Sequence, residues 1–371
     1  MSSPPNQPSV LVVGGCGFVG FHIVRHLVQD FTFSSVTALS RFATRSKQHH
    51  VDGAQYIDGD ITNRASIQQA LEALAPTVII HASSAPPTTG SAKEFKSVTV
   101  DGTKNLVELA LESKHVQVFV YTSSNMANAG LEHLVAREDC LLANKDPKAA
   151  LYARAKADAE DMVLGANNTP TGSVGPGDWA GCLATGALRF PMVYGSHNAI
   201  TIAGCMDALL NKQTKVVIGD GNNLWSYCSS RNAAESHLVL ARALLNPDKW
   251  EGIAGEAFNI NDGEPHLFWG FPRDCWRIAG HQDKSDHSSN IPAWFALALA
   301  NILEFLYWVF TFGTKRPGLL GRQQVEYCCF TNTYNVDKAR TRLGFVPQQH
   351  YDEVLEEGVR WYLEHGDGTK G

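Results

Sequence analysis

Several features that would direct this chain of 371 residues to other classes of protein are missing. Charged residues are sparse at 18%, the net charge is -6 and no basic stripe is present, so we expect no nucleic-acid partner. The eight cysteines include no Cys-x-x-Cys pair and no zinc-ligand spacing to histidine, which indicates reduced thiols and no metal site. The polar start, residues 1–9, lacks the basic and apolar regions of a secretory signal and predicts a cytoplasmic, reducing location.

Alternating strands and helices fill the first half of the chain. Val10 to Val13 is an apolar run, a glycine-rich turn follows, and apolar residues from Ile23 to Phe31 recur at helical spacing. Further strands are predicted at residues 36–39, 55–57, 77–80 and 116–121, and further helices at 66–74 and 102–111. This order predicts an α/β fold with a doubly wound parallel sheet of the Rossmann type.

The strict alternation fades after Tyr194, which divides the chain into two parts. Residues 1–195 are expected to form a dinucleotide-binding domain, with a loop insertion at 165–181 where Gly, Asn, Thr and Pro cluster. Residues 196–371 are expected to form a smaller C-terminal substrate-binding lobe, interleaved with the last elements of the sheet. A strand at 182–188 is predicted to end the first part, and the predicted elements of the lobe are a strand at 215–218 and helices at 233–245 and 352–363.

A glycine fingerprint marks the turn after the first strand. Gly14, Gly17 and Gly20 form a Gly-x-x-Gly-x-x-Gly pattern that opens the first helix, with Phe18 and Val19 between its last two glycines. Glycines let backbone amides approach a pyrophosphate, and the helix N-terminus attracts its negative charge. In this strand–turn–helix context the pattern predicts a dinucleotide site rather than an empty turn.

The end of the second strand predicts which dinucleotide is preferred. An acidic residue there binds a ribose 2′-hydroxyl, whereas arginine accommodates a 2′-phosphate, and this chain has Ser40 followed by Arg41. We therefore expect NADP(H) to be preferred, with NAD(H) as the alternative cofactor. The competing interpretation is that Arg41 is an ordinary solvated charge.

Two further strand ends are expected to contact the cofactor. Asp60 and Ile61 follow the third strand, where the carboxylate can accept from the adenine amino group; alternatively Asp60 caps the helix that starts near Asn63. Ala82 and Ser83 end the fourth strand, where small residues allow a close approach to the cofactor or tight packing.

The sequence also contains a candidate catalytic set for hydride transfer. Tyr152 and Lys156 are four residues apart and share a helix face, and Ser124 ends the fifth strand at the edge of the sheet where ligands bind. A phenol with a pKa near 10 is a poor acid or base at neutral pH, and a nearby ammonium lowers that pKa. Ser124 can orient the substrate oxygen. The set predicts hydride exchange between a ketone or alcohol and a nicotinamide.

These residues resemble the extended short-chain dehydrogenases, and in particular the branch of 3β-hydroxysteroid dehydrogenases and sterol-4α-carboxylate 3-dehydrogenases. The matching segments are Gly14 to Gly20, Gly59 to Ile61, Gly102-Thr103 with Asn105, Tyr121 to Ser124, Tyr152 to Lys156, Arg189 to Pro191, Val193 to Gly195, Ile218 to Asn223, Asp337 to Ala339 and Leu343 to Phe345. The resemblance implies that Ser124, Tyr152 and Lys156 are catalytic and that Pro191 and Val193 line the nicotinamide. It also implies a homodimer through the helices that flank Gly102 and Tyr152.

The chain departs from this branch where relatives face their substrate. Residues 225–231 lack the usual aromatic-Asp and Val-Glu signature, Ala155 replaces a serine, and Thr99 replaces an asparagine. We expect an NADP(H)-dependent oxidoreductase that interconverts a ketone and a secondary alcohol on a bulky apolar skeleton, steroid, terpenoid or polyketide-like, in specialised metabolism. The candidate wall residues of the substrate site are Pro86, Pro87, Met126 and Trp225, each of which can also be a core residue.

Three alternatives to this function stay open. The first is an NAD-dependent 3-dehydrogenase coupled to decarboxylation or to double-bond isomerisation. The second is a nucleotide-sugar epimerase, although residues 224–226 lack the arginine that clamps a sugar diphosphate. The third is a non-catalytic dinucleotide-binding regulator, which the presence of both Tyr152 and Lys156 disfavours.

One long apolar stretch, residues 291–312, stands apart from the rest of the chain. Asn301 and Glu304 near its middle make a bilayer span costly, so a buried helix or a helix lying on a membrane is favoured. We expect peripheral membrane contact through 291–312, on the endoplasmic reticulum if it occurs, and a small apolar substrate.

Overall fold

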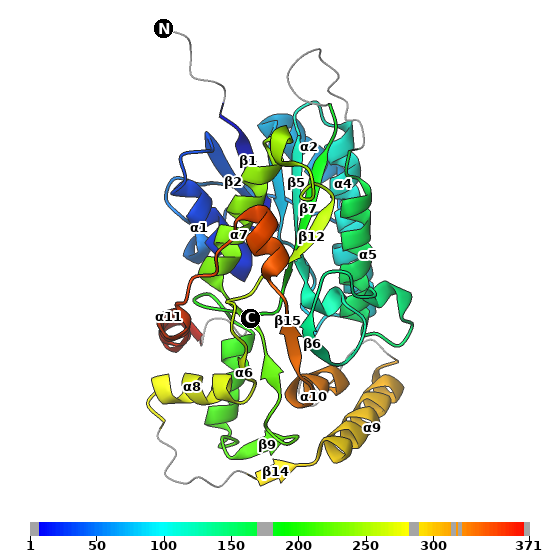
Figure 1. Cartoon of the computed structure of the whole chain (residues 1–371), viewed down its shortest axis with the longest axis vertical. Coiled ribbons are helices and arrows are strands. Elements are labelled where there is room, and N and C mark those ends of the chain that lie inside the picture. Colours follow the sequence, from blue (N-terminus) through cyan, green and yellow to red (C-terminus); the bar gives the residue numbers. More distant parts are fainter. Residues whose placement is uncertain (1–6, 169–180, 282–288, 313–316, 318–320, 367–371) are drawn as a thin grey trace.

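The computed structural model of the protein describes residues 7–168, 181–281, 289–312, 317 and 321–366. In this part of the chain, seven parallel strands form one sheet flanked by helices on both faces (Figure 1). Across the sheet the strands are β12 (Glu256–Asn259), β7 (Ala184–Phe190), β5 (Val118–Ser124), β4 (Val78–His81), β1 (Ser9–Val13), β2 (Ser35–Ser40) and β3 (Gln55–Asp58). The doubly wound α/β fold predicted from the alternation is confirmed.

Two apolar layers hold the helices to this sheet. One face packs Val10, Val12 and Val120 against α1 (Phe18–Val28) and α7 (Ser230–Leu244). The other packs Leu11 and Phe119 against α2 (Arg64–Leu74), α4 (Gly102–Glu112) and α5 (Leu151–Gly165). Successive strand residues enter opposite layers because side chains alternate across a sheet. The layers fix the carboxyl edge of the strands, where the site is built.

The helix before α4 is irregular. A short α3 (Ala92–Glu94) leads into a π-helical segment, Phe95–Asp101, that continues directly into α4. Ser91 caps α3 through a reciprocal hydrogen-bond box with Glu94. Such π segments are frequent at functional sites, and this one borders the pocket described below.

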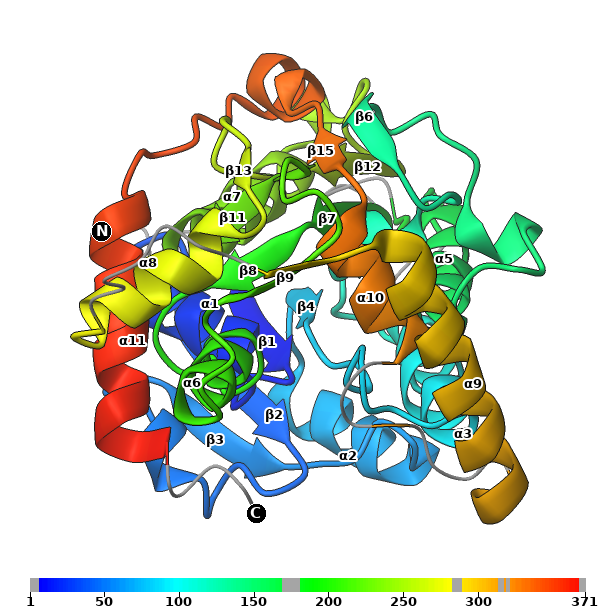
Figure 2. The ribbon, with the colours of Figure 1, turned by 90° about the horizontal axis from the view of Figure 1, so that it is seen from below.

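Shorter strands and helices form the C-terminal part. The strands are β6 (His133–Ala136), β8 (Met192–Tyr194), β9 (Val216–Ile218), β10 (Leu224–Trp225), β11 (Tyr227–Ser229), β13 (His266–Leu267), β14 (Ser289–Ile291) and β15 (Asn332–Tyr334). The helices are α6 (Thr201–Leu210), α8 (Gly270–Ile278), α9 (Ala293–Thr311), α10 (Arg322–Cys329) and α11 (Tyr351–His365). Figure 2 shows α9 at the periphery of this part, with α10 on its inner side.

The observed elements match most of the predicted ones. Helices α2, α7 and α11 lie within a few residues of the predicted 66–74, 233–245 and 352–363. The strand predicted at 182–188 is found as β7, and the later strand β12 pairs with it, so the sheet draws its last strand from beyond residue 195. Most of the predicted loop insertion at 165–181 lies outside the described residues, and the division into two domains stays a prediction.

Candidate active site

A pocket of about 520 Å³ opens at the carboxyl ends of β1, β2, β3 and β4. Eight of the residues predicted to bind a dinucleotide line it: Gly14, Gly17, Ser40, Arg41, Asp60, Ile61, Ala82 and Ser83. Residues from four separate strand ends thus converge on one cavity, as ligand sites in open parallel sheets do.

The glycine turn at this pocket fits a pyrophosphate. Gly14 has a φ of +87°, and a Cβ added there would lie 2.8 Å from the backbone nitrogen of Ser83. A Cβ on Gly20 would lie 2.0 Å from the carbonyl oxygen of Gly14. Gly17 begins α1 with no side-chain cap, and no acidic residue lies in the first turn, so the amides near Phe18 and Val19 are available to an anion.

The wall of the pocket formed by the end of β2 and by α3 contains charges of both signs. Ser40 Oγ accepts a hydrogen bond from the backbone N–H of Cys16 at 3.2 Å, while Arg41 is exposed and makes no ion pair among the described residues. Glu94 also lines the pocket, from α3. No sequence pattern predicted Glu94 at this position, because a long stretch of chain separates it from β2.

Short turns follow β3 at the wall of the pocket that contains Asp60. Asp60 Oδ1 accepts hydrogen bonds from the backbone N–H and the hydroxyl of Thr62, at 2.9 and 2.8 Å. The cap of α2 is Asn63, whose side chain accepts from the backbone N–H of Ser66. The alternative role of Asp60 as the helix cap is therefore wrong. Pro86, predicted as a substrate wall, also lines this dinucleotide pocket.

The predicted catalytic side chains lie together beside this pocket. Tyr152, on α5, is partly exposed, and its phenol lies near the Ser124 side chain at the end of β5. Burial raises the pKa of Tyr152 to about 12, and the Ser124 hydroxyl opposes that rise. Ser124 Oγ also accepts from the backbone N–H of Met126 at 3.2 Å. In this state the phenol is held neutral and positioned.

Lys156 lies one turn further along α5 and is 4% exposed. Its ammonium donates to the carbonyl oxygen of Thr122 at 2.7 Å and lies 4.7 Å from the centre of the Tyr121 ring. Burial lowers the pKa of Lys156 to about 7, and the negative charge of Glu160 opposes that shift. Such a shifted lysine in a buried site is a mark of functional positions.

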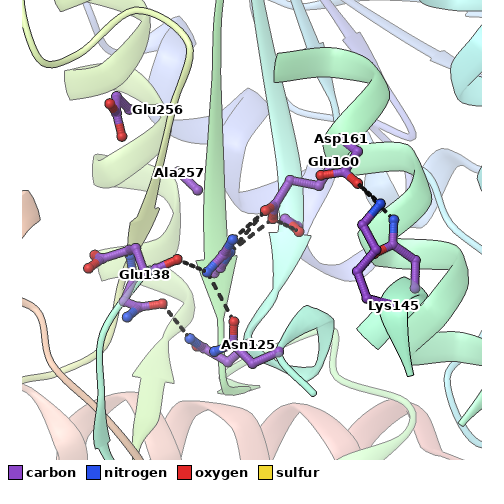
Figure 3. A network of polar contacts seen from close by, with 12 residues as sticks. Asn125, Glu138, Lys145, Glu160, Asp161, Glu256 and Ala257 are labelled. Atoms are coloured by element: carbon purple, nitrogen blue, oxygen red, sulfur yellow. Dashed lines mark hydrogen bonds and ion pairs between the residues drawn. The ribbon is translucent and has the colours of Figure 1, made fainter. Parts of the chain in front are cut away.

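A buried ion pair between Glu160 of α5 and Arg189 lies next to these catalytic side chains. Arg189, on β7, meets Glu160 at 2.6 Å, and the two side chains are 4% and 0% exposed. Glu160 also accepts from the Ser123 hydroxyl at 2.6 Å, while Arg189 donates to Asn128 Oδ1 and to the Glu138 carbonyl, both at 3.0 Å. Figure 3 shows Glu160 pointing into this network, with Glu138 and Asn125 around it. The network joins α5 to the carboxyl ends of β5 and β7.

The remaining predicted residues lie in several environments. Met126 packs in a small apolar cluster, and Pro191 and Val193 are partly buried, with Val193 in β8. Trp225 is 4% exposed and donates to the carbonyl oxygen of Phe330 at 2.9 Å. The roles of these residues at the nicotinamide and the substrate stay predictions, as does that of Pro87.

One aromatic residue near the site was missed. Tyr327, on α10, packs edge-on against Trp225 with ring centres 5.3 Å apart. Burial raises its pKa, and the neighbouring Tyr152 contributes to the rise, which places the two phenols close together. No pattern around residue 327 could have indicated this, because tertiary packing alone brings α10 to the site.

The fold and the Tyr-x-x-x-Lys set together define an extended short-chain dehydrogenase/reductase, an NAD(P)-dependent enzyme that acts on a CH–OH group. The model of the 3-beta hydroxysteroid dehydrogenase/isomerase family matches residues 11–290. The chain belongs to this family, which confirms the resemblance and the predicted oxidoreductase class. A nicotinamide dinucleotide is the cofactor of the class; the choice between NAD and NADP is a separate question.

Curated relatives match nearly the whole chain. A decarboxylating sterol-4-alpha-carboxylate 3-dehydrogenase of Schizosaccharomyces pombe is 31% identical over 365 residues, 98% of both chains. An enzyme of the same name from Gibberella zeae is 30% identical over 311 residues, 82% of this chain and 97% of the relative. Human short-chain dehydrogenase/reductase family 42E member 1 is 27% identical over 374 residues, 98% of this chain and 89% of that protein.

Solved structures share the fold at low sequence identity. A UDP-galactose 4-epimerase superposes with a TM-score of 0.68 at 16% identity, over 96% of this chain and 99% of that one. The UDP-glucose 4-epimerase of Thermotoga maritima superposes with a TM-score of 0.67 at 18% identity, over the same shares. At these identities the likeness shows the fold alone.

Proposed function

We propose that this protein oxidises the 3-hydroxyl group of a sterol-like 4-carboxylate, with loss of carbon dioxide. The observation that carries the proposal is the grouping of Tyr152, Ser124 and the buried Lys156 beside the pocket, in a chain whose curated relatives carry that activity in their names. These relatives favour the oxidative alternative over the ketone reduction that we expected from the sequence. An apolar sterol skeleton agrees with the apolar substrate that we predicted.

The residues of the chain account for the proton transfer. Ser124 holds the substrate oxygen, and Tyr152 accepts the hydroxyl proton as the carbonyl forms. A bound nicotinamide dinucleotide supplies the hydride acceptor and a positive ring that favours the phenolate. Lys156, when protonated, also favours the phenolate and can hold a ribose hydroxyl.

Loss of the carboxylate follows from the product of oxidation. A 3-ketone makes the 4-carboxylate a β-keto acid. Its bond to the carboxylate breaks, carbon dioxide leaves, and the electron pair of that bond forms an enolate with the negative charge on the ketone oxygen. Protonation of the enolate at C4 then gives the ketone. Ser124 and protonated Tyr152 donate to the oxygen on which this negative charge develops, so the same groups serve both steps.

For the cofactor we propose a preference for NADP(H), with NAD(H) also accepted. Arg41 is exposed on the wall of the pocket, and Ser40 provides no carboxylate to repel a 2′-phosphate. A guanidinium pairs with phosphate in a bidentate manner, which favours the phosphorylated cofactor. The relevant measurement is the affinity of purified protein for NADPH and NADH, read from tryptophan energy transfer; a preference for NADH would reject the role of Arg41.

The activity is tested by following reduced cofactor and carbon dioxide together. Purified protein receives a 3β-hydroxy-4-carboxysterol in mixed micelles with either oxidised cofactor. We expect equal amounts of reduced cofactor and carbon dioxide. The matched substrate without the carboxylate should give reduced cofactor alone. Reduced cofactor without carbon dioxide from the carboxysterol would contradict the decarboxylation, and turnover of a nucleotide sugar instead would contradict the proposal as a whole.

We also propose that α9 lies on a lipid surface, on the cytoplasmic face of the endoplasmic reticulum. Among the described residues, α9 is the helix long and apolar enough to cross a membrane by length and composition, and only 11% of it is buried. Its exposed side chains include Trp294, Phe305, Trp308 and Phe310. Tryptophan and phenylalanine beside apolar bulk are typical of helices that lie in the membrane interface.

The polar groups of α9 argue for lying on the membrane instead of spanning it. Ala296 and Ala300 pack on Val325 of α10, and Glu304 accepts from the backbone N–H of Arg322 at 3.0 Å. One side of α9 is therefore held by protein and the other is free for lipid. In the sequence, Lys315 and Arg316 follow α9 and suit anionic headgroups.

Flotation with lipid vesicles tests this placement. We expect the protein to float with vesicles of phosphatidylcholine and phosphatidylserine, and less with phosphatidylcholine alone. Failure to float with either would reject the membrane role and leave the enzymatic proposal untouched.

The homodimer through α4 and α5 is a further proposal, and sedimentation equilibrium of the purified protein tests it.

A further inference from the structure

The dinucleotide pocket holds a carboxylate that no sequence pattern assigned. The charged residues that line it, within the described part of the chain, are Arg41, Asp60 and Glu94. Asp60 already accepts two hydrogen bonds from Thr62 through its Oδ1 atom. Glu94 comes from α3, on another wall of the pocket than the end of β2 that carries Arg41.

Local structure fixes where the Glu94 carboxylate lies. Its Oε2 atom accepts from the backbone N–H of Ser91 at 2.8 Å and from the Ser91 hydroxyl at 2.7 Å. The turn before it is tight, since a Cβ on Gly90 would lie 2.6 Å from the Pro86 carbonyl and 2.8 Å from the Phe95 ring. A carboxylate tied in this way stays at the pocket wall when a ligand enters.

The charges of Glu94 and Arg41 also interact electrostatically. The hydrogen bonds from Ser91 are the main cause that lowers the pKa of Glu94, and the positive charge of Arg41 adds to them. Glu94 is therefore ionised at neutral pH. Both side chains are exposed, so their influence on each other and on a ligand acts through water and is screened by salt.

We propose that Glu94 is a second determinant of cofactor selectivity, which opposes Arg41 by weakening the binding of a 2′-phosphate. A doubly charged phosphate near Arg41 is attracted by the guanidinium and repelled by the Glu94 carboxylate. A 2′-hydroxyl carries no charge and is affected by neither in this way. The carboxylate therefore reduces the preference for NADP(H) that Arg41 creates, and it leaves the binding of NAD(H) almost unchanged. This inference rests on the proposal that this pocket binds the 2′-phosphate end of NADP(H).

The test removes the charge of Glu94 and keeps its hydrogen bonds. In Glu94→Gln the amide oxygen can still accept from Ser91, as in capping boxes with glutamine. We expect NADPH to bind about 3- to 10-fold more tightly to the purified variant, with NADH changed less than about 2-fold. The gain should shrink as ionic strength rises. Glu72→Gln, on α2 and outside the pocket lining, is the matched control with the same change in charge.

The outcomes separate this inference from the cofactor proposal. An unchanged ratio of the NADPH and NADH affinities in Glu94→Gln would overturn the inference, as would an equal gain in Glu72→Gln. In the parallel variant Arg41→Ala we expect weaker NADPH binding. If Arg41→Ala binds NADPH as wild type does, the role of Arg41 fails; a selective gain in Glu94→Gln alone would still support Glu94.

Discussion

The protein departs from ordinary burial in opposite ways at α5 and at α9. In α5, Lys156 and Glu160 are charged residues in the interior, and Arg189 joins them from β7. In α9, aromatic and aliphatic side chains from Trp294 to Phe310 face outward. Charged residues are almost never fully buried unless paired, and large exposed apolar patches are rare on soluble monomers.

The two helices differ in whether their unusual side chains have partners. Every buried charge near α5 has a partner: Lys156 has the Thr122 carbonyl, and Glu160 has Arg189. The apolar face of α9 has no such partner among the described residues, apart from its contact with α10 and β9. The hydrogen-bonded network at α5 holds the catalytic side chains in place. The exposed apolar face of α9 indicates that a lipid or another partner binds there.

The largest effect is expected from Tyr152→Phe at the α5 site. The variant keeps the ring and removes the hydroxyl that lies beside Ser124. We expect kcat to fall by up to about 10⁴-fold, since proton transfer by a positioned side chain contributes that much at most. NADPH affinity should stay within about 2-fold. Tyr362→Phe, in α11, is the control; a kcat near that of wild type in Tyr152→Phe would favour the non-catalytic regulator.

The next largest effect is expected on stability, from Glu160→Gln. The variant leaves the Arg189 guanidinium buried and uncompensated, which costs about 3 to 5 kcal/mol in such pairs. Urea unfolding followed by circular dichroism measures the loss. The double variant Glu160→Gln with Arg189→Met should recover most of it. A loss below about 1 kcal/mol in the single variant would show that the pair does not support α5 in this way.

Sequence alone predicted the parts of the site that local patterns encode. The glycine turn, Arg41 and the pair Tyr152 and Lys156 were identified because each depends on a fixed spacing beside a strand or along a helix. Glu94 and Tyr327 were missed because packing over long sequence separations places Glu94 at the pocket and Tyr327 against Trp225. The buried pair of Glu160 and Arg189 has the same origin: Glu160 lies on the helix predicted to carry Tyr152 and Lys156, and Arg189 comes directly after the strand predicted at 182–188.

The elements of the fold also divide into those that local sequence patterns predict and those that they do not. Most strands of the seven-stranded sheet were predicted because they alternate with apolar helices, while β6, β10, β13 and β15 have four residues or fewer and lie outside that alternation. The apolar stretch at 291–312 was identified, and its helix spans Ala293–Thr311. Whether it was buried or exposed could not be read from composition, because core helices and interfacial helices are both rich in the same residues.

An intermediate effect is expected from charging the outward face of α9. Phe305→Glu with Trp308→Glu places two carboxylates where we propose lipid, so binding to anionic vesicles should weaken about 10- to 100-fold. The free energy of unfolding should change little, because both side chains are more than half exposed. Phe31→Glu, at an exposed position on the opposite part of the molecule, is the control. Equal vesicle binding by the α9 variant and wild type would leave α9 without the proposed role.

The smallest effect concerns the cost of keeping Lys156 in the interior. In the cofactor-free protein its pKa is lowered by burial to about 7, whereas in the unfolded chain it is 10.5. Between these values the unfolded chain binds more protons, so this group makes the protein more stable as pH rises, and its full cost is present below pH 7. Lys156→Met removes that cost. We expect its Tm to exceed that of wild type by a few degrees at pH 6, and the difference to narrow as pH rises toward 10. Lys104→Met, on the exposed side of α4, should show no such trend. A difference that is constant across pH would mean that the lost packing and the bond to Thr122, and not the buried charge, control the stability at this site.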